Sequence, residues 1–505
     1  MSIAVEMRNI TKSFPGVLAN DKIDFVVRNG EIHGLLGENG AGKTVLMSIL
    51  YGLYRPDEGQ IFVNEKEVKI DSSATAIKLG IGMVHQHFML VPSLTVAENI
   101  VLGREPTKNK VFLDMDKIMD EIKDLCDRYQ LEVDPKALVH TLPVGVQQRV
   151  EILKALYREA EILILDEPTS VLTPQEVESL FKAMRTLREQ GKAVIFISHK
   201  LKEVLAICDK ITVLKRGKVV GTVEANETSP SELAEMMVGR EVLFTYEKKN
   251  VRPEKAVLRV ENLQALSDRK LLALKGISFD VCEFEILGIA GVEGNGQTEL
   301  VEVLAGLREA TAGNIYLDGK QVTNTSTSER IDLGVSHVPE DRHKRGLILD
   351  FSVVENLILG RHNKPPFTTG WVRLDFEKAS DFADGLIQEY SIKTPSKDTL
   401  ARYLSGGTQQ RMIVAREFSR KPKLIIASQP TRGLDVGATE YVRKKLVEMR
   451  DQGCAILLIS ADLDEILGLS DRIAVVYEGK IVAIRDRSGA SELELGLLMA
   501  GGKSD

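Results

Sequence analysis

The sequence predicts an α/β protein that contains two similar domains. The chain has 505 residues, which exceeds one ordinary hydrophobic core and suits two domains of about 250 residues. Short apolar runs alternate with helical patterns: residues 162–165 (ILIL) precede the helical pattern 174–191, and residues 193–198 (AVIFIS) follow it. Strands that alternate with helices are parallel and joined by crossovers, which is the pattern of an α/β fold.

An internal repeat defines the two domains. Residues 31–44 (EIHGLLGENGAGKT) match residues 285–298 (EILGIAGVEGNGQT) at an offset of 254, and residues 142–149 (LPVGVQQR) match residues 404–411 (LSGGTQQR) at an offset of 262. The second copy therefore has eight more residues than the first. We expect these residues in the Pro/Gly/Thr-rich stretch 363–371.

The repeat also sets the expected domain boundaries. We expect a first domain at 1–248 and a second domain at 256–505. The charged segment 249–255 lies between the two copies and is too short to form a domain, so we expect it to be the linker.

The composition argues against several functional classes. A hydrophobic content of 43% and a charged content of 28% are typical of a globular protein. The net charge of −7 argues against nonspecific binding to nucleic acid. The four cysteines include no CxxC pair, which indicates reduced thiols in a cytoplasmic protein. We find no signal peptide and no apolar run of the roughly 18 residues that a membrane span needs, so we expect any membrane role to come through partners.

Residues 37–44 (GENGAGKT) form a predicted phosphate-binding loop. They fit the pattern GxxxxGK[ST], follow an apolar run and precede a helical pattern. In such a loop, backbone N–H groups and the positive end of the following helix bind phosphates, the lysine supplies a positive charge and the hydroxyl is a ligand for Mg²⁺. The candidate ATP-binding residues are Gly37, Glu38, Asn39, Gly40, Ala41, Gly42, Lys43 and Thr44.

Four residues outside the loop carry candidate roles in hydrolysis. Asp166 ends a predicted strand and is a candidate for holding Mg²⁺ together with Thr44, and Glu167 is a candidate base for the attacking water. His199 follows the next predicted strand and could contact the γ-phosphate, and Gln86 could contact the metal or the water.

This set of motifs resembles the nucleotide-binding domain of ABC transporters. The loop 37–44, Gln86, the signature-like segment 142–149, the strand 162–168 (ILILDEP) and the triplet 197–199 (ISH) occur in the order of that family. The resemblance covers essentially the whole chain. It implies two tandem P-loop NTPase domains, each with a mainly parallel sheet core, an antiparallel β subdomain and a helical subdomain. It also implies hydrolysis of ATP with Mg²⁺.

In that family two domains pair head to tail, and each ATP lies between the phosphate loop of one domain and the signature of the other. The resemblance therefore implies that the first domain's motifs are completed by the second domain's signature. Phe14 occupies the position at which the family stacks adenine. The second domain would supply Ser405, Gly406, Gly407, Gln409 and Asp435.

The other loop–signature pairing contains all of the positions at which a functional residue is replaced. In the second copy glutamine replaces the phosphate-loop lysine, the carboxylate pair is gone, alanine replaces the histidine, and Asp268 stands at the position of Phe14. In the first copy proline and valine replace the Ser-Gly of the signature, and Thr173 stands where the second copy has Asp435. We expect this site to hydrolyse ATP negligibly. Its residues would be Gly291, Gly294, Gly296, Gln297, Thr298, Glu340, Ser428, Gln429 and Ala461 from the second domain, with Pro143, Val144 and Gly145 from the first.

Fused tandem domains without a membrane segment resemble the ATPase subunits of bacterial importers for simple sugars and nucleosides. Residues 83–100, 142–153 and 291–300 favour the nucleoside branch, with purine nucleosides as the expected cargo. The resemblance implies two integral membrane permease subunits, an extracytoplasmic substrate-binding lipoprotein, no nucleic acid, and a place at the cytoplasmic face of the cell membrane. The alternative is the same role in a pentose or hexose importer.

Two other classes fit less well. A soluble tandem ABC ATPase that acts on ribosomes or nucleic acid usually keeps both carboxylate pairs and has a long charged linker, whereas this chain has one pair and a short linker. A regulatory ATP-binding subunit without turnover would not need the intact Glu167 and His199.

The segments after the two Gln-loop positions are candidates for contact with the permeases. Residues 87–100 carry the apolar side chains Phe88, Met89 and Leu90, which either dock on a permease or pack inside their own domain. Residues 343–357 are the counterpart in the second copy. The basic stretch 342–345 is either a solvated loop or a permease contact.

Overall fold

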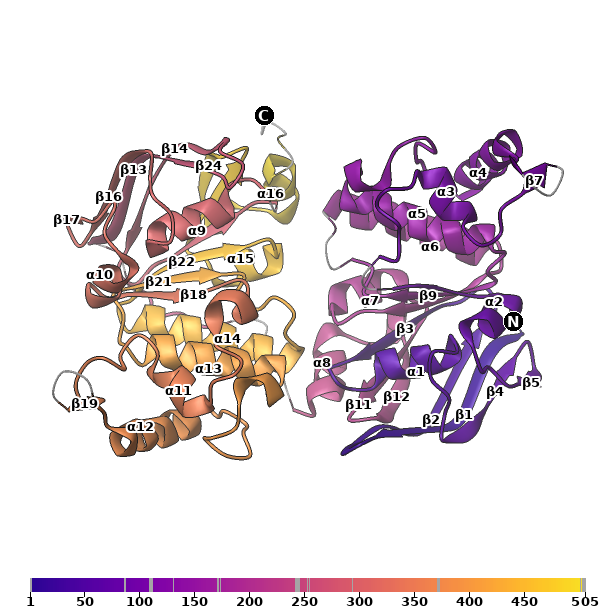
Figure 1. Ribbon diagram of the computed structural model, residues 1–505, viewed down its shortest axis with the longest axis horizontal. Helices are drawn as coiled ribbons and strands as arrows, with labels where there is room; N and C mark the ends of the chain where they lie inside the picture. Colours follow the sequence, from indigo (N-terminus) through magenta and orange to yellow (C-terminus); the bar gives the residue numbers. More distant parts are fainter. Residues whose placement is uncertain are drawn as a thin grey trace. The chain divides into compact units, whose positions relative to one another are not determined.

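The chain divides into two compact units, Met1–Val242 and Leu243–Asp505, each of which is considered by itself (Figure 1). Tyr246 packs on the core of unit 2 and Lys248 pairs with Asp471, so this segment belongs to unit 2, ahead of the expected linker. The computed structural model describes residues 2–85, 88–108, 112–129, 131–169, 172, 174–240, 246–251, 253, 255–292, 294–369, 373–499 and 501.

Unit 1 is built on a six-stranded sheet. Its strands lie parallel except for the antiparallel edge strand β12. Three of its four inner strands, β3 (Ile32–Gly37), β10 (Ala193–Ile197) and β9 (Ile162–Asp166), are buried along their whole length, which explains their largely apolar sequences. The order is β12 (Lys218–Glu224), β11 (Lys210–Lys215), β3 (Ile32–Gly37), β10 (Ala193–Ile197), β9 (Ile162–Asp166) and β6 (Ile81–Val84).

A second, antiparallel sheet and a helical part complete unit 1. The antiparallel sheet has the order β2 (Val17–Arg28), β1 (Ile3–Phe14), β4 (Glu58–Val63) and β5 (Lys66–Val68). Its apolar face shares one core with helix α1 and the main sheet. The helices are α1 (Lys43–Leu50), α2 (Ser73–Lys78), α3 (Val96–Val101), α4 (Met115–Tyr129), α5 (Val144–Tyr157), α6 (Pro174–Glu189), α7 (Leu201–Ile207) and α8 (Pro230–Val238), and a short hairpin joins β7 (Thr107–Lys108) to β8 (Phe112–Leu113).

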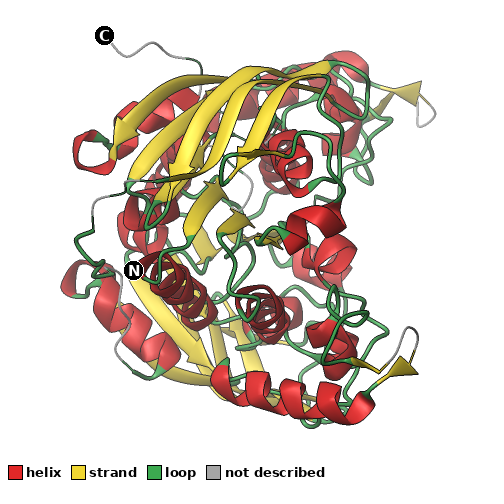
Figure 2. Cartoon of the chain, turned by 90° about the vertical axis from the view of Figure 1, so that its left-hand side faces the viewer, coloured by secondary structure: helices red, strands yellow, loops and turns green. Residues whose placement is uncertain are grey.

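Unit 2 repeats this topology. Its main sheet has the order β18 (Val335–Val338), β21 (Leu424–Ser428), β22 (Ala455–Ser460), β15 (Ile286–Ala290), β23 (Arg472–Tyr477) and β24 (Lys480–Asp486). Its antiparallel sheet has the order β14 (Leu272–Cys282), β13 (Ala256–Leu266), β16 (Ala312–Leu317) and β17 (Lys320–Gln321). These long strands form a curved layer (Figure 2).

The helices of unit 2 follow the same plan. Helix α9 lies between the antiparallel sheet and the main sheet, and its buried side chains join both in one core (Figure 1). The helices are α9 (Gln297–Ala305), α10 (Thr327–Asp332), α11 (Val353–Ile358), α12 (Phe376–Glu389), α13 (Gly406–Phe418), α14 (Val436–Asp451), α15 (Leu463–Leu469) and α16 (Glu492–Met499), with the hairpin β19 (Thr368–Thr369) and β20 (Arg373–Leu374). The predicted two-domain P-loop fold, with a parallel core, an antiparallel β part and a helical part in each copy, is thus confirmed. Within the described residues, the structure contains no helix with the length and apolarity to cross a bilayer.

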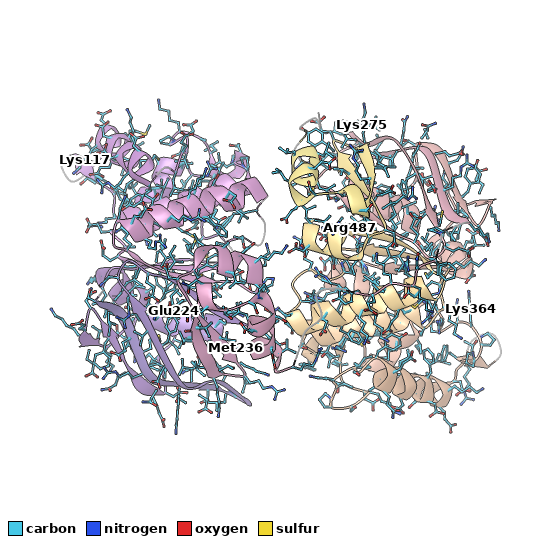
Figure 3. The ribbon with its side chains drawn as sticks, turned by 180° about the vertical axis from the view of Figure 1, so that it is seen from behind. Lys117, Glu224, Met236, Lys275, Lys364 and Arg487 are labelled. Carbon is cyan, nitrogen blue, oxygen red and sulfur yellow. The ribbon has the colours of Figure 1, made fainter. Side chains whose placement is uncertain are left out.

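The eight extra residues of unit 2 lie in three places. Three precede α11, because α3 and α11 start 257 positions apart whereas β6 and β18 start 254 apart. Four lie between α11 and β19, near Lys364, which is labelled in Figure 3, and one lies further on. The expectation that all of them fall in 363–371 is therefore wrong for the first three, which lie in a π-helical turn at Arg342–Gly346, and for the last one, which lies beyond α12.

A buried asparagine fixes the connection from the main sheet to the helical part in each unit. Asn356 is 0% exposed. Its Oδ1 accepts the N–H of Ile348 at 2.9 Å, and its Nδ2 donates to the carbonyls of Ile348 and Phe351 at 2.9 and 3.2 Å. Asn99 makes the matching bonds to Val91 in unit 1. These bonds satisfy the buried asparagine amide and tie the connecting segment to the helix.

We expect Asn356→Ala to lower the free energy of unfolding of unit 2 by about 2–3 kcal/mol, because it leaves the N–H and C=O of Ile348 without their partner. Urea denaturation followed by circular dichroism measures the change. Asn363→Ala, at an exposed loop position, is the matched control and should change the stability by less than about 0.5 kcal/mol. Equal effects of the two substitutions would contradict this role.

Candidate nucleotide-binding site

The phosphate loop of unit 1 connects β3 to α1. Gly40 and Gly42 have φ values of 81° and 101°, a region that favours glycine. A Cβ at Gly42 would lie 2.3 Å from the carbonyl oxygen of Ala19, so no other residue fits there. Helix α1 begins at Lys43, directly after this turn. The backbone N–H groups at its start are therefore presented to the loop, as an anion site requires.

Lys43 closes the loop on itself. Its Nζ donates to the carbonyl oxygens of Gly37 at 2.7 Å and Glu38 at 3.1 Å. The side chain is buried. The ammonium group therefore lies at the inside of the loop, where it is placed to meet a phosphate.

Asp166 lies at the carboxyl end of β9, next to the loop. Burial, with a smaller contribution from the negative charge of Glu167, raises the pKa of Asp166 to about 6, although Lys43 and a hydrogen bond with Thr44 act in the other direction. Because burial is the main cause, the raised pKa shows that the ionised carboxylate is poorly solvated, and a bound divalent cation would stabilise its charge. The oxygens of Asp166 and Thr44 are ligands that Mg²⁺ accepts, with phosphate oxygens and water as the remainder. The residues present therefore fit Mg²⁺.

Glu167 and His199 form a pair beside Asp166. The His199 Nδ1 and the Glu167 Oε1 are 3.0 Å apart. Burial raises the pKa of Glu167, but the hydrogen bond from His199 and the charges of His199, Lys43 and Lys200 outweigh it, so the pKa lies below its ordinary value. Glu167 is therefore ionised at neutral pH and can accept a proton.

The structure thus brings together five of the predicted residues, namely Lys43, Thr44, Asp166, Glu167 and His199. Phe14 lies apart from them at the end of β1, where its ring packs edge-on against Tyr54 with centroids 5.4 Å apart. Tyr54 is an aromatic partner that the sequence analysis missed. Gln86 and Thr173, and the side chain of Val144, lie outside the described residues.

The predicted signature of unit 2 forms the start of helix α13. Ser405 is the N-cap, and its side chain accepts the N–H of Thr408 at 3.4 Å. Asp435 caps α14 by accepting the N–H of Ala438 at 2.7 Å. A Cβ at Gly407 would lie 3.8 Å from the Asp435 carboxylate, so the two caps are neighbours. Gln409 instead turns into the protein and donates to the carbonyl of Ala401 at 3.0 Å.

The matching helix start in unit 1 is different. Pro143 is the N-cap of α5 and makes no side-chain cap bond. A Cβ at Gly145 would lie only 2.1 Å from the carboxylate oxygen of Glu176, so this carboxylate lies against the helix start. The offset of 262 places Ala438 at the position of Glu176 in unit 2. The sequence analysis missed Glu176, although the repeat alignment contains the difference.

Unit 2 keeps the shape of the phosphate loop without its charge. Gln297 lies at the position of Lys43 and its Nε2 donates to the carbonyl of Gly291 at 3.2 Å, which preserves the tether across the loop. Gly294 and Gly296 have φ values of 94° and 97°, as in unit 1. Gln297 is followed at the start of α9 by Thr298, the counterpart of Thr44.

The strand end that carries the carboxylates in unit 1 also keeps its backbone in unit 2. Gln429 has φ 45° and Glu167 has φ 47°. The side chain of Gln429 accepts the N–H of Ala461 at 3.2 Å, and the buried Ser428 ends β21. Neither side chain can bind a cation as a carboxylate does or serve as a base.

Ion pairs replace two further parts of the unit 1 site. Asp268 and Arg308 form an ion pair of 2.6 Å at the positions of Phe14 and Tyr54. Glu340, at the position of Gln86, pairs with Arg432.

Unit 1 also contains a cavity of about 200 Å³ away from the phosphate loop. Its lining includes Met83 of β6, Glu151 and Lys154 of α5, and Met89 and Leu102 from the connecting segments. The backbone of Met89 is held on both sides, because its N–H donates to Glu151 at 2.6 Å and its carbonyl accepts from Lys154 at 2.9 Å. The Met89 side chain is 62% exposed.

Comparison with known proteins agrees with a nucleotide-binding site in this chain. The family profile described as "ABC transporter" matches residues 20–170 and 274–432. The chain is 50% identical to the guanosine import ATP-binding protein NupO of Bacillus subtilis, over 99% of this chain and 98% of that protein. It is 49% identical to the nucleoside import ATP-binding protein NupA of Lactococcus lactis, over 99% and 98%, and 48% identical to the glucose import ATP-binding protein TsgD13 of Haloferax volcanii, over 99% and 96%.

These matches agree with the duplicated phosphate loops and with the two sheets of each unit. The chain therefore belongs to the ABC transporter family and is an ATPase.

Proposed function

We propose that this chain is the ATP-hydrolysing subunit of an importer for nucleosides, with purine nucleosides as cargo, and that it has one competent composite site. The observation that carries the proposal is the distribution of the losses over the two units. The charged phosphate-loop and strand-end residues are intact only in unit 1, whereas the serine-capped signature helix is present only in unit 2. Head-to-tail pairing would combine the intact loop of unit 1 with the intact signature of unit 2 in one site. The other site would combine the altered loop of unit 2 with the altered signature of unit 1.

The chemistry that unit 1 would perform follows from its side chains. Lys43 and the loop amides bind the phosphates of ATP, and Mg²⁺, when bound by Thr44 and Asp166, balances phosphate charge and orients the nucleotide. Glu167 accepts the proton of the attacking water, while His199 fixes the orientation of Glu167 through the 3.0 Å contact. A base of this kind supplies a factor of roughly 10²–10⁴ in rate.

Unit 2 would lose these contributions at its own loop. The replacement of an ammonium by the Gln297 amide removes an interaction worth about 4 kcal/mol with a phosphate at a surface-like dielectric. Gln429 cannot take up a proton from water. On the opposing signature, Pro143 has no N–H and the Glu176 carboxylate would repel a phosphate. We therefore infer that the second site turns over negligibly.

The cargo assignment rests on two observations. Segments 83–100, 142–153 and 291–300 favour the nucleoside branch, and two relatives of about 50% identity have names that specify guanosine and nucleoside import. A specific observation favours the alternative of a sugar importer, because TsgD13, named for glucose import, is 48% identical. Uptake of labelled guanosine, ribose and glucose by cells or vesicles with the assembled transporter decides between them.

The partners would be two integral membrane permease subunits and an extracytoplasmic substrate-binding lipoprotein, with the chain at the cytoplasmic face of the membrane. We infer that the cavity of unit 1 receives a cytoplasmic segment of a permease. Met89 supports this inference, because Glu151 and Lys154 hold its backbone while its apolar side chain is presented to solvent beside the cavity. Nucleic acid is not an expected partner, given the net charge of −7.

We expect Glu167→Gln to abolish steady-state ATP hydrolysis by the assembled transporter, because it removes the proposed base of the competent site. Gln429→Glu should add no turnover to that variant, since its loop still lacks the lysine and faces the damaged signature. Phosphate release measures both. Substantial turnover by the Glu167→Gln variant would contradict the assignment of a single competent site.

The raised pKa of Asp166 predicts a pH dependence of Mg²⁺·ATP binding. Only the ionised carboxylate binds Mg²⁺, so the affinity should be nearly constant above about pH 7 and should fall as the pH drops through 6, by about tenfold between pH 7 and pH 5. Calorimetry at pH 5 and pH 7 measures the difference. Asp166→Asn corrects for protonation of the nucleotide itself and should lack the additional tenfold fall. The same pH dependence in both proteins would contradict the role of Asp166.

We expect Met89→Glu to weaken association with the permeases roughly tenfold or more, because the interface would bury an unpaired charge. Co-purification of the chain with its permease subunits measures the effect. Leu271→Glu is the control, since Leu271 is 66% exposed on the antiparallel part of unit 2. Normal recovery of the Met89→Glu complex would exclude the cavity as a docking surface.

A further inference from the structure

The three residues that unit 2 adds before α11 belong to a π-helical turn, Arg342–Gly346. Asp341 caps the turn by accepting the N–H groups of His343 and Lys344, each at 2.9 Å. Single π-helical turns are rare and occur frequently at functional sites. The turn is therefore a defined element of unit 2, and its side chains determine what it contacts.

Two of these side chains attach the turn to the rest of unit 2. The His343 Nε2 lies 2.9 Å from the Oε1 of Gln409 in the signature helix α13. Arg345 donates to the buried Glu302 of helix α9 at 2.5 Å. The turn is thus held between the signature helix and the helix that follows the phosphate loop, and both contacts fix the position of the residue that precedes them, Arg342.

The guanidinium of Arg342 lies against the start of the signature helix. A Cβ at Gly406 would be 3.5 Å from its Cζ, and a Cβ at Gly433 would be 3.2 Å from its Nη2. Gly406 directly follows the cap Ser405, and Gly433 lies between the Gln429 turn and Asp435. The guanidinium therefore occupies the same end of unit 2 as the two caps that the proposed composite site uses.

No carboxylate among the described residues pairs with this guanidinium. Within the residues that the structure describes, Arg342 makes no side-chain hydrogen bond or ion pair, although it is only partly exposed. The two nearest acids in sequence have other partners, since Asp341 caps the turn and Glu340 pairs with Arg432. Burial lowers the pKa of Arg342, and the charge of Asp341 offsets this in part. A partly desolvated cation without a counter-ion gains free energy when an anion binds.

We propose that Arg342 is a further catalytic residue that contacts the terminal phosphate of the ATP bound to the phosphate loop of unit 1. The proposal rests on the head-to-tail pairing argued above. A planar guanidinium can donate two parallel hydrogen bonds to a phosphate and can neutralise the charge that spreads over the transferred group. The two signature helices then differ in the charge beside their first turn. Arg342 lies against the helix in unit 2, whereas the carboxylate of Glu176 lies against the helix in unit 1.

ATP turnover by the assembled transporter tests the proposal. Arg342→Ala should lower the turnover at saturating ATP by tenfold or more, which is the usual cost of a lost donor to a reacting oxyanion. Arg342→Lys should retain part of the activity, because it keeps the charge without the planar fork. Lys344→Ala, which removes an exposed cation from the same turn, is the matched control and should remain within about twofold of the parent.

Nucleotide affinity separates a direct contact from a structural effect. In the full chain with Glu167→Gln, Arg342→Ala should weaken the binding of ATP severalfold and leave the binding of ADP unchanged, because only ATP has the third phosphate. An equal loss for both nucleotides, or unchanged turnover of Arg342→Ala, would overturn the proposal. Circular dichroism melts of each variant establish that the fold is retained.

A further variant distinguishes this inference from the pairing on which it depends. Ser405→Asp keeps an N-cap residue but places a carboxylate at the proposed phosphate contact. If Ser405→Asp abolishes turnover and Arg342→Ala does not change it, the pairing stands and the role of Arg342 is wrong. If neither variant changes turnover, the pairing itself is wrong. Loss of turnover in both, with the selective effect on ATP, supports both.

Discussion

The loops at the ends of the parallel strands are positioned by backbone hydrogen bonds, and the rest of each unit depends on this constraint. Glu167 donates its N–H to the carbonyl of Ile197 at 3.0 Å, and Gln429 donates its N–H to Ile459 at 2.7 Å. Both residues have φ near 46° although neither is glycine, a strained conformation that persists where the surrounding structure imposes it. The turn therefore survives when its side chains change, which is why unit 2 could lose its carboxylates and keep its fold.

The same principle explains how the phosphate loop of unit 2 lost its lysine. The Lys43 ammonium serves two purposes in unit 1: it ties the loop across to Gly37 and presents a positive charge. Gln297 retains the first purpose through its bond to Gly291 and lacks the second. An apolar residue would leave the carbonyl of Gly291 without this partner, at a cost of about 1–3 kcal/mol for a buried group. The amide thus keeps the bond across the loop and removes its positive charge.

The sequence predicted the two-copy fold and the five residues that the structure brings together in unit 1, because these depend on local patterns: the phosphate-loop spacing, the apolar strands and the residues at their ends. It did not predict features that arise where distant segments meet. Glu176 lies thirty-one residues beyond Gly145 in sequence and against it in space. The Asp268–Arg308 pair and the place of Arg342 likewise depend on tertiary contacts. The extra residues were assigned to the Pro/Gly-rich loop because composition marks flexible loops, whereas a π-helical turn has no such composition.

Unit 2 also differs from unit 1 in the region that corresponds to the cavity of unit 1. The offset of 262 places Glu417 at the position of Ala155, and its carboxylate pairs with Arg416 at 2.8 Å and Arg420 at 3.0 Å. A buried ionic cluster of this kind tolerates little rearrangement, because the loss of one partner leaves a buried charge unpaired. This cluster therefore occupies positions that line the cavity in unit 1, namely those of Lys154, Ala155 and Arg158. The two units therefore differ in charge at this surface as well as at the phosphate loop and the strand end.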